Sequence, residues 1–419
     1  MPGNYKIVLG PDSELHSGIH SSFLKHPPPG VTYLFKPHHH IFEVKESEGF
    51  DPFRSTCQSE SVHYELTSSD AITGIHSSRI PVNNFCPYLV DADCLLGTIQ
   101  FGQSLAVGQY NDSSLRGKVV CEIEAGRIER MLEFYLADNC IALLFRSQYS
   151  RRLFLELVRE VKTSQIAEIF RSKSDVLYPT LPAISPRSKS IKKTRILFAG
   201  RDRETKGAEI AREVFFQLNQ MAPDKCSIIW IGEHSIEDTN RLQFVEFYNT
   251  LPRKSYLNLL YGCDISFSPT EFESYGMAIV EAVCLGLAIV TSCGAGMEHI
   301  IELIENRKEG VLVDNSLSTS SKIQDYRNVL LQLINNPDDL MKMRWSSYLR
   351  ARDGSLSIDK RNLRILHYYE KMAVWTGEIS QSILDSNLYS VKIDSLELQR
   401  KRLTYLNGRS ARLLVSSAE

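Results

Sequence analysis

The sequence predicts an α/β fold in which short strands alternate with helices. Three apolar, β-branched runs, at 194–200, 226–232 and 264–269, each end in Gly or Pro. Helical periodicity is visible between them, at 208–220 and around 255–263. This alternation is typical of a doubly wound parallel sheet. Ligands bind such sheets outside the carboxyl ends of the strands, so we expect the functional residues directly after each strand.

The chain is long enough for about two to three domains. Its N-terminal half has strands of its own, which we predict at 6–10, 118–124, 140–145 and 175–179. The segment 186–194 is polar and basic and contains Pro, so we interpret it as the linker between the halves.

These features divide the chain into an N-terminal domain over 1–188, a second domain over 189–356 and a C-terminal part over 357–419. An amphipathic helix is predicted from about residue 356 to Trp375. The sequence leaves open whether the C-terminal part packs back onto the first domain.

The overall charge limits the classes of partner. With 48 basic and 50 acidic residues the formal net charge is −2, so we expect no nucleic-acid partner. Nine cysteines without a CxxC pair argue against a disulfide framework and against a zinc ribbon. The histidine run at 38–40 has no carboxylate or Cys at ligand spacing, and we interpret it as solvated loop surface.

The terminal and apolar segments favour a cytoplasmic protein. The first ten residues lack a basic segment followed by a long apolar core, so we expect no secretory signal. The apolar stretch 277–291 is interrupted by Glu281 and is shorter than the about 20 residues of a membrane-spanning helix.

The stretch "SPTEFESYGMAIVEAVCLG" at 268–286 carries the main candidate site. Ser268 and Pro269 end a predicted strand, Gly276 permits a close backbone approach, and the following apolar segment forms a helix that starts near Tyr275. The free N–H groups and the dipole of such a helix start bind phosphate or another anion.

Two carboxylates lie at different depths along this helix. Glu273 lies just outside the helix start, whereas Glu281 lies about 9 Å further along the axis. This spacing suits a long ligand better than a single reacting bond. A nucleotide sugar fits, with its sugar at Glu273, its diphosphate at the helix start and its ribose hydroxyls at Glu281. As alternatives, Glu273 is a helix-capping acid and Glu281 a structural ion-pair partner.

A diphosphate also needs cations, and the loop "GRDRETKGAE" supplies candidates. Arg201 follows the strand immediately and Lys206 precedes the next helix. The alternative interpretation of both residues is a solvated loop.

In order and spacing, the segments "GRDRETKG", "DISFSPTEFESYGMAIVEA", "TSCGAGMEHI" and "EGVLVD" resemble the donor-binding half of the retaining glycosyltransferases of family 4. The resemblance covers about residues 194–315 and is much weaker over the N-terminal half. It implies the GT-B architecture, with two Rossmann-like domains facing each other across a cleft, and here a C-terminal helical extension.

The resemblance assigns roles to the residues of the main candidate site. It implies that Glu273 contacts donor-sugar hydroxyls, that Glu281 contacts the ribose, and that Arg201 and Lys206 bind the diphosphate. The further donor-binding residues that it implies are Gly200, Ser274, Tyr275, Gly276 and Met277, with backbone groups from Tyr275 to Met277 contacting the sugar and the phosphate. Ser274 and Tyr275 replace the small residue and the Phe that are usual in the family.

A further crevice loop is implied at Ser292, Gly294, Gly296 and Glu298, although we interpret Glu298 as ordinary helix-start charge.

In the N-terminal half the resemblance implies a loop that approaches the donor phosphate at Ser17 and Gly18, within "GPDSELHSGIH". The segment 74–93 resembles the region of an acceptor-side histidine, for which His76 is the candidate, with Asp91 and Asp93 as lesser ones. A lone histidine is also a common structural residue.

The implied reaction is retaining transfer of a sugar from a nucleotide diphosphate sugar, the co-substrate, to an acceptor hydroxyl, without a metal or other cofactor. Glu273, Arg201, Lys206 and His76 are the implied catalytic residues. A glycan, a lipid-linked molecule or a small molecule would be the acceptor, and peripheral membrane association stays open.

The sequence leaves open other uses of the same donor site. A phosphorylase or nucleotide-sugar hydrolase would use the same donor site, and a non-catalytic protein would only bind the sugar nucleotide. A GxGxxG or GxxxxGK[ST] motif at a strand end, as in nicotinamide or P-loop enzymes, is absent from the sequence.

Overall fold

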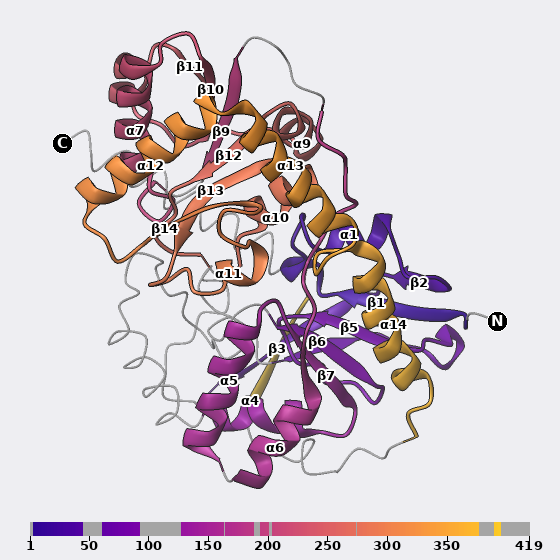
Figure 1. Cartoon of the computed structure of the whole chain (residues 1–419). Helices are drawn as coiled ribbons and strands as arrows, with labels where there is room; N and C mark the ends of the chain where they lie inside the picture. The colour runs from indigo at the N-terminus through magenta and orange to yellow at the C-terminus, as the bar shows by residue number, and fades with distance from the viewer. Residues whose placement is uncertain are drawn as a thin grey trace. The chain divides into compact units, whose positions relative to one another are not determined.

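In a computed structural model the chain divides into two compact units, Met1–Leu177 with Asn362–Glu419, and Tyr178–Arg361. The structure describes residues 3–44, 61–92, 127–162, 164–187, 193–200, 203–273, 275–376 and 389–394. Each unit contains a six-stranded parallel sheet flanked by helices (Figure 1). The prediction of two doubly wound α/β sheets is therefore confirmed, while the predicted cleft between them stays a prediction.

The sheet of the first unit has the order β2-β1-β5-β6-β7-β8. Its strands are β2 (Val31–Leu34), β1 (Tyr5–Gly10), β5 (Gly74–Ser78), β6 (Tyr88–Ala92), β7 (Cys140–Phe145) and β8 (Ser174–Val176). Its helices are α1 (His20–Lys25), α4 (Arg127–Leu136), α5 (Gln148–Val161) and α6 (Ser164–Lys173), with short 3₁₀ turns at Asp12–Glu14 and Ser68–Asp70. The strands predicted at 6–10 and 140–145 are present, and the one predicted at 118–124 lies outside the described residues.

A small antiparallel sheet in the first unit joins β15 (Tyr389–Asp394), β3 (His38–Val44) and β4 (Ser61–Tyr64). The histidine run belongs to β3, so its interpretation as solvated loop surface is wrong. Because neighbouring strand residues point to opposite faces, His38 and His40 are buried, whereas His39 pairs with Glu65 at 2.8 Å.

The sheet of the second unit has the order β11-β10-β9-β12-β13-β14, in which every pair is parallel. Its strands are β11 (Val245–Tyr248), β10 (Cys226–Gly232), β9 (Thr194–Gly200), β12 (Ile265–Ser268), β13 (Ala288–Cys293) and β14 (Gly310–Asp314). Its helices are α7 (Ala208–Met221), α8 (Ile236–Arg241), α9 (Arg253–Tyr261), α10 (Met277–Cys284), α11 (Ile300–Leu303), α12 (Thr319–Asn335) and α13 (Pro337–Arg352). Numbered along the chain, this order is 3-2-1-4-5-6, the Rossmann order, and it reverses between β9 and β12.

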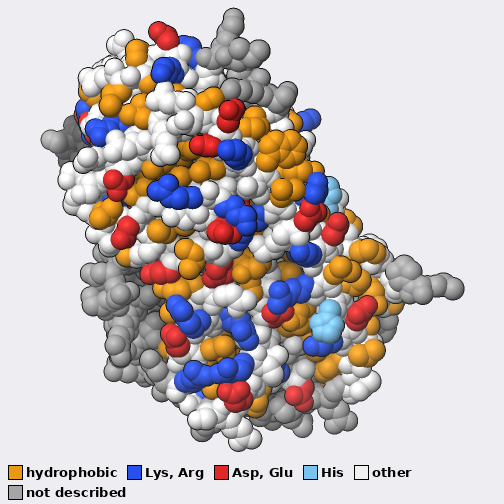
Figure 2. All heavy atoms as spheres, viewed as in Figure 1, with side chains coloured by type: hydrophobic (Ala, Val, Ile, Leu, Met, Phe, Trp, Pro, Cys, Tyr) orange, Lys and Arg blue, Asp and Glu red, His pale blue; other side chains and the backbone are white. Residues whose placement is uncertain are grey.

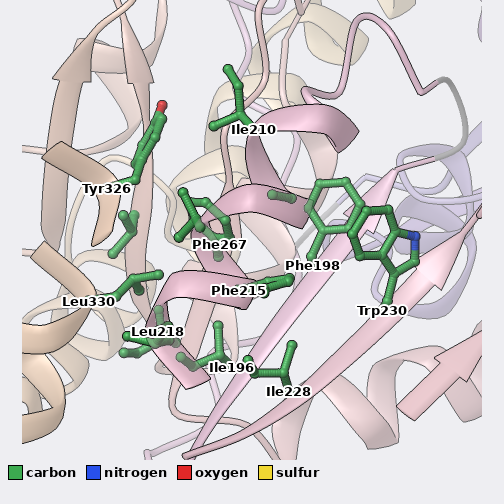
Figure 3. Packing of buried hydrophobic residues seen from close by; sticks show 14 of the residues in the cluster. Ile196, Phe198, Ile210, Phe215, Leu218, Ile228, Trp230, Phe267, Tyr326 and Leu330 are labelled. Carbon is green, nitrogen blue, oxygen red and sulfur yellow. The ribbon is translucent and has the colours of Figure 1, made fainter. Parts of the chain in front are cut away.

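The alternation of side chains along the central strands builds two cores in the second unit. Ile196, Phe198 and Trp230 pack on one face of the sheet with residues of α7 and α12 (Figure 3). Leu197 and Ile229 pack on the other face with residues of α9, α10 and α11. Because helices cover both faces of the sheet, these strands are apolar throughout. The strands were predicted from these apolar runs.

The boundary between the units lies at Leu177, before the predicted linker at 186–194. The predicted division at 188 is too late because the segment after Leu177 bonds to the second unit. The Ile184 N–H donates to the Cys284 carbonyl at 2.8 Å, and the Thr180 hydroxyl donates to the Leu356 carbonyl. The strand predicted at 175–179 is also shorter than expected and ends at Val176.

The predicted C-terminal helix is α14 (Ile358–Ala373), and the unit boundary falls within it. From Asn362 onward it belongs to the first unit, where Ile365, Tyr369 and Met372 are buried at helical spacing. The Arg364 guanidinium and the Tyr368 hydroxyl both bond to Asp175.

The surface carries charges of both signs. Figure 2 shows Lys and Arg side chains interspersed with Asp and Glu on the face in view, in keeping with a formal net charge of −2. Among the described residues, no helix combines the length and apolar character needed to cross a membrane.

Candidate functional site

An ion pair joins the two loops at the point where the strand order of the second sheet reverses. Lys206 follows β9, Glu273 follows β12, and the Lys206 ammonium contacts the Glu273 carboxylate. Each side chain is 23% exposed, so the pair is accessible but sheltered. Both residues were predicted site residues, and the structure brings them into direct contact at the usual ligand-binding edge of such a sheet.

Gly207 allows the two loops to approach. Its backbone is left-handed, with φ +67°, and a Cβ there would lie 2.0 Å from the Pro269 carbonyl oxygen. The Glu271 N–H also donates to the Thr205 carbonyl at 2.8 Å. Any residue other than Gly at 207 would therefore separate the loops and move Lys206.

The start of α10 lies directly after Glu273. Gly276 is the N-cap residue with φ +88°, and its carbonyl accepts from the N–H groups of Ile279 at 2.9 Å and Val280 at 3.1 Å. Within the described residues, no side-chain hydrogen bond caps this position. The helix was predicted to start near Tyr275, and it starts at Met277. The positive end of its dipole therefore lies beside Glu273.

Glu281 is buried, with 2% exposure, and forms an ion pair with Arg253 at 2.5 Å. The Tyr256 hydroxyl also bonds to Glu281, and the pKa of Tyr256 is raised, first by burial and then by this carboxylate. Arg253 and Tyr256 belong to α9, and we did not predict either. The contact matches the alternative interpretation of Glu281 as an ion-pair partner, and its contact with a ribose stays a prediction.

His299 is a second neighbour that sequence reasoning missed. Its ring is 2% exposed, interacts electrostatically with Glu273 and Lys206, and hydrogen-bonds to the Tyr275 backbone. Burial lowers the pKa of His299 to about 4, against the opposing effect of Glu273. His299 could have been found from the sequence because it belongs to the predicted crevice loop "TSCGAGMEHI", directly after Glu298.

The loop after β13 is bonded to the loop after β12. The Asn315 side-chain amide donates to the carbonyls of Glu271 at 2.8 Å and Ala295 at 2.6 Å. The Glu273 N–H donates to the Gly296 carbonyl at 3.4 Å. These bonds bring the predicted crevice loop, with Gly294 and Gly296, to the same strand ends.

Two other residues of that loop are placed differently. Ser292 is buried and bonds to the Tyr326 hydroxyl at 2.7 Å, within the core rather than at the loop tip. Glu298 is half-buried beside the start of α11.

Gly200 ends β9, and a Cβ there would lie 2.6 Å from the Cβ of Lys206, so the absence of a side chain leaves room for the lysine. Met277 is the first residue of α10. Arg201 and Ser274, both predicted site residues, lie outside the described residues.

The candidates of the N-terminal half belong to the first unit. His76 in β5 is fully buried, with its Nδ1 2.8 Å from the Tyr369 hydroxyl of α14. The Gly18 N–H donates to the His16 ring at 3.0 Å, and the Ser17 carbonyl accepts from the Ser21 hydroxyl.

Asp91 is the penultimate residue of β6, and its carboxylate lies 3.2 Å from the His20 ring. Burial alone would raise the pKa of Asp91, but His20 and Arg146 hold it at about 2. Asp93 lies outside the described residues. Within the described ranges, no group of three or more His, Cys, Asp or Glu residues is arranged to hold a metal ion.

Three solved structures show how this chain compares with known proteins. A mutant of S. aureus TarM, in complex with Fondaparinux, alpha-GlcNAc-glycerol and UDP, is 14% identical over 70% of this chain and 55% of its own, with a TM-score of 0.48. The pneumococcal O-GlcNAc transferase GtfA, in complex with UDP and GlcNAc, is 13% identical over 74% and 53%, with a TM-score of 0.47. Anabaena HepE, in complex with UDP-glucose, is 14% identical over 70% and 78%, with a TM-score of 0.46.

The chain thus spans little more than half the length of the first two structures. No curated protein matches its sequence. A family model does match: residues 183–350 fit the family described as "Glycosyl transferases group 1". This segment contains the Lys206–Glu273 pair, α10 and His299. Residues 183–350 are therefore a glycosyl transferases group 1 domain.

Proposed function

We propose that this protein transfers a sugar from a nucleotide diphosphate donor to an acceptor hydroxyl, with retention of the anomeric configuration. The observation that carries the proposal is the Lys206–Glu273 pair at the reversal of strand order, inside a glycosyl transferases group 1 domain. The cation Lys206, the acid Glu273 and the start of α10 all lie at the carboxyl ends of the strands of this sheet. This combination suits a ligand that has a diphosphate at one end and hydroxyl groups at the other.

In the protein alone, Lys206 and Glu273 neutralise each other. Donor binding would give Lys206 a phosphate oxygen and would give Glu273 sugar hydroxyls, so each charge would exchange one partner for another. Arg201, by the family resemblance, would be a second cation for the diphosphate. The fixed charges and the helix start would then stabilise the leaving diphosphate as it separates from the sugar carbon.

We further propose that the acceptor proton passes to the leaving phosphate oxygen and that no metal ion takes part. Glu273 would orient the sugar and balance the positive charge that develops on it, without forming a covalent bond. Glu281, held by Arg253, would face the ribose. We assign acceptor binding to the first unit, with His76 as the candidate residue. The proposed acceptor is a glycan, a lipid-linked molecule or a small molecule. We propose a cytoplasmic location, which is compatible with each of these acceptors.

A thermal-shift panel tests the donor site. UDP, GDP, ADP and dTDP, and a hexose derivative of each, are added to the full chain with 5 mM EDTA and again with MgCl₂. We expect one base to raise the melting temperature without added metal. No shift with any member contradicts the proposal, and a shift that requires metal contradicts its metal-independent form.

Product analysis separates transfer from the alternatives. The stabilising donor is incubated with candidate acceptors, with phosphate and with buffer alone. We expect a glycosylated acceptor whose anomeric configuration matches that of the donor. Release of free sugar at the same rate with and without acceptor would identify a hydrolase, and sugar phosphate would identify a phosphorylase.

A further inference from the structure

Two residues outside the Lys206–Glu273 pair hold the turn that leads into α10. The Tyr275 side chain is 1% exposed, and its hydroxyl donates to the Pro179 carbonyl at 3.4 Å. Hydrogen bonding to the Tyr275 backbone raises the pKa of His299, so the ring N–H is the donor and the Tyr275 carbonyl the acceptor. The turn is therefore fixed by a side-chain contact on one side and a backbone contact on the other.

Packing alone does not explain a histidine at position 299. Its neighbours along the chain, Met297 and Ile300, are fully buried core residues, and an aliphatic side chain would suit the same environment. The other ring nitrogen, Nε2, is buried without a hydrogen-bond partner within the described part of the chain. A half-satisfied buried imidazole costs stability and thus indicates a role beyond packing.

The Tyr275 carbonyl and the Gly276 N–H belong to one planar trans peptide, in which they point in opposite directions. A ring that fixes the carbonyl therefore also fixes the N–H, which points away from His299. Among the described residues, no backbone carbonyl accepts from this N–H. The same peptide precedes the start of α10 and follows Glu273 by two residues.

We propose that His299 is a positioning residue of the donor site: by holding the Tyr275 carbonyl it aims the Gly276 N–H at the diphosphate of the bound donor. This inference rests on the proposed function for its ligand. His299 would act in its neutral form, with the proton on the nitrogen that faces Tyr275. A positively charged ring would instead attract Glu273 away from Lys206.

Three substitutions separate the hydrogen bond from the size of the ring. His299→Asn keeps an N–H donor near the Nδ1 position, His299→Gln carries its amide near the Nε2 position, and His299→Leu has no donor. His367→Leu, on an exposed position of α14, is the matched control.

Isothermal calorimetry with UDP, GDP and ADP measures the effect on ligand binding. For the nucleotide that binds the wild type, we expect Kd to rise about tenfold in the Leu and Gln variants, the size of one lost hydrogen bond. The Asn variant should stay within about threefold of the wild type, and the His367 control should equal it. If Asn is as impaired as Leu, or if Leu binds like the wild type, the inference is wrong.

Hydrogen exchange of the ligand-free protein gives a readout that needs no nucleotide. We expect faster amide exchange over 275–279 in the Leu and Gln variants than in the wild type and the Asn variant. Equal exchange in all four proteins contradicts the positioning role. If the wild type binds no nucleotide, the proposed function fails, while the exchange rates still decide whether His299 holds the turn.

Discussion

Lys206 and Glu273 form an ion pair across the two neighbouring strands at which the order of the second sheet reverses. The two residues are 67 positions apart in the sequence, and each lies in the loop that follows its strand. The pair places a cation and an acid, whose charges compensate each other, at the edge of the sheet where we propose that the donor binds.

Substitution of Glu273 by Gln should lower turnover with little effect on nucleotide affinity. The amide keeps the shape but carries no charge to balance the sugar in the transition state, so we expect kcat to fall about 100-fold. Affinity for the nucleoside diphosphate should stay equal or increase, because Lys206 loses its internal partner. Steady-state kinetics with calorimetry measures both quantities, and a large loss of affinity with normal turnover would contradict the assignment.

Substitution of Lys206 by Met should weaken nucleoside diphosphate binding. Loss of a charged hydrogen bond to phosphate costs about 1.5–3 kcal/mol, or roughly 10- to 150-fold in Kd. Lys342→Met is the matched control, since Lys342 is an exposed lysine that forms an ion pair with Asp339. Equal affinity in the two variants would exclude Lys206 from the site.

Substitution of Glu281 by Ala should destabilise the second unit and weaken nucleotide binding. Removal of the buried carboxylate leaves Arg253 without its ion-pair partner, at a cost of about 1–3 kcal/mol because that guanidinium remains partly exposed. Urea unfolding of Glu281→Ala, Arg253→Met and the double variant measures the coupling. A binding loss in Glu281→Ala that Arg253→Met does not reproduce would indicate direct contact with the ligand.

His299 makes stability depend on pH. Its pKa is about 4 in the folded protein and 6.5 in the unfolded chain, so below pH 6.5 the unfolded state binds a proton that the folded state does not. Stability due to this group is complete above pH 6.5 and is lost as pH falls toward 4, up to roughly 3 kcal/mol.

This loss is expected to be smaller in His299→Asn, which does not titrate. Urea unfolding at pH 7 and pH 4.5 compares the two proteins. Glu273 and Lys206 are the charged groups that interact with the His299 ring. Both are present in the wild type and in the Asn variant, so they do not account for a difference between the two proteins. An equal loss of stability in both would show that His299 is not the titrating group.

Substitution of Gly207 by Ala should separate the two loops. The new Cβ would lie 2.0 Å from the Pro269 carbonyl, and the left-handed backbone adds strain, so we expect at least about 1 kcal/mol of destabilisation. Nucleotide affinity should fall with it, because Lys206 precedes Gly207 directly. Unchanged melting and binding would contradict the role of this close approach.

The sequence by itself determined the α/β class, strands β9, β10 and β12 and helices α7, α9 and α10 of the second unit, and the start of α10 to within about two residues. These features depend on local patterns: apolar runs for strands buried on both faces, helical periodicity between them, and Gly276 at a helix start. The placement of Lys206 and Glu273 at strand ends followed from the same patterns, because strand ends of a parallel sheet share one edge.

Only the tertiary structure decided which side chains meet at that edge. Arg253 and Tyr256 reach Glu281 from another helix, and His299 reaches Tyr275 from another loop. The burial of His38 and His40 in β3 and the docking of Tyr369 against His76 depend on contacts between distant segments as well. Sequence periodicity reports which face of an element is buried, but it does not encode what that face packs against. The partners of each buried polar group therefore follow from the packing of the whole unit.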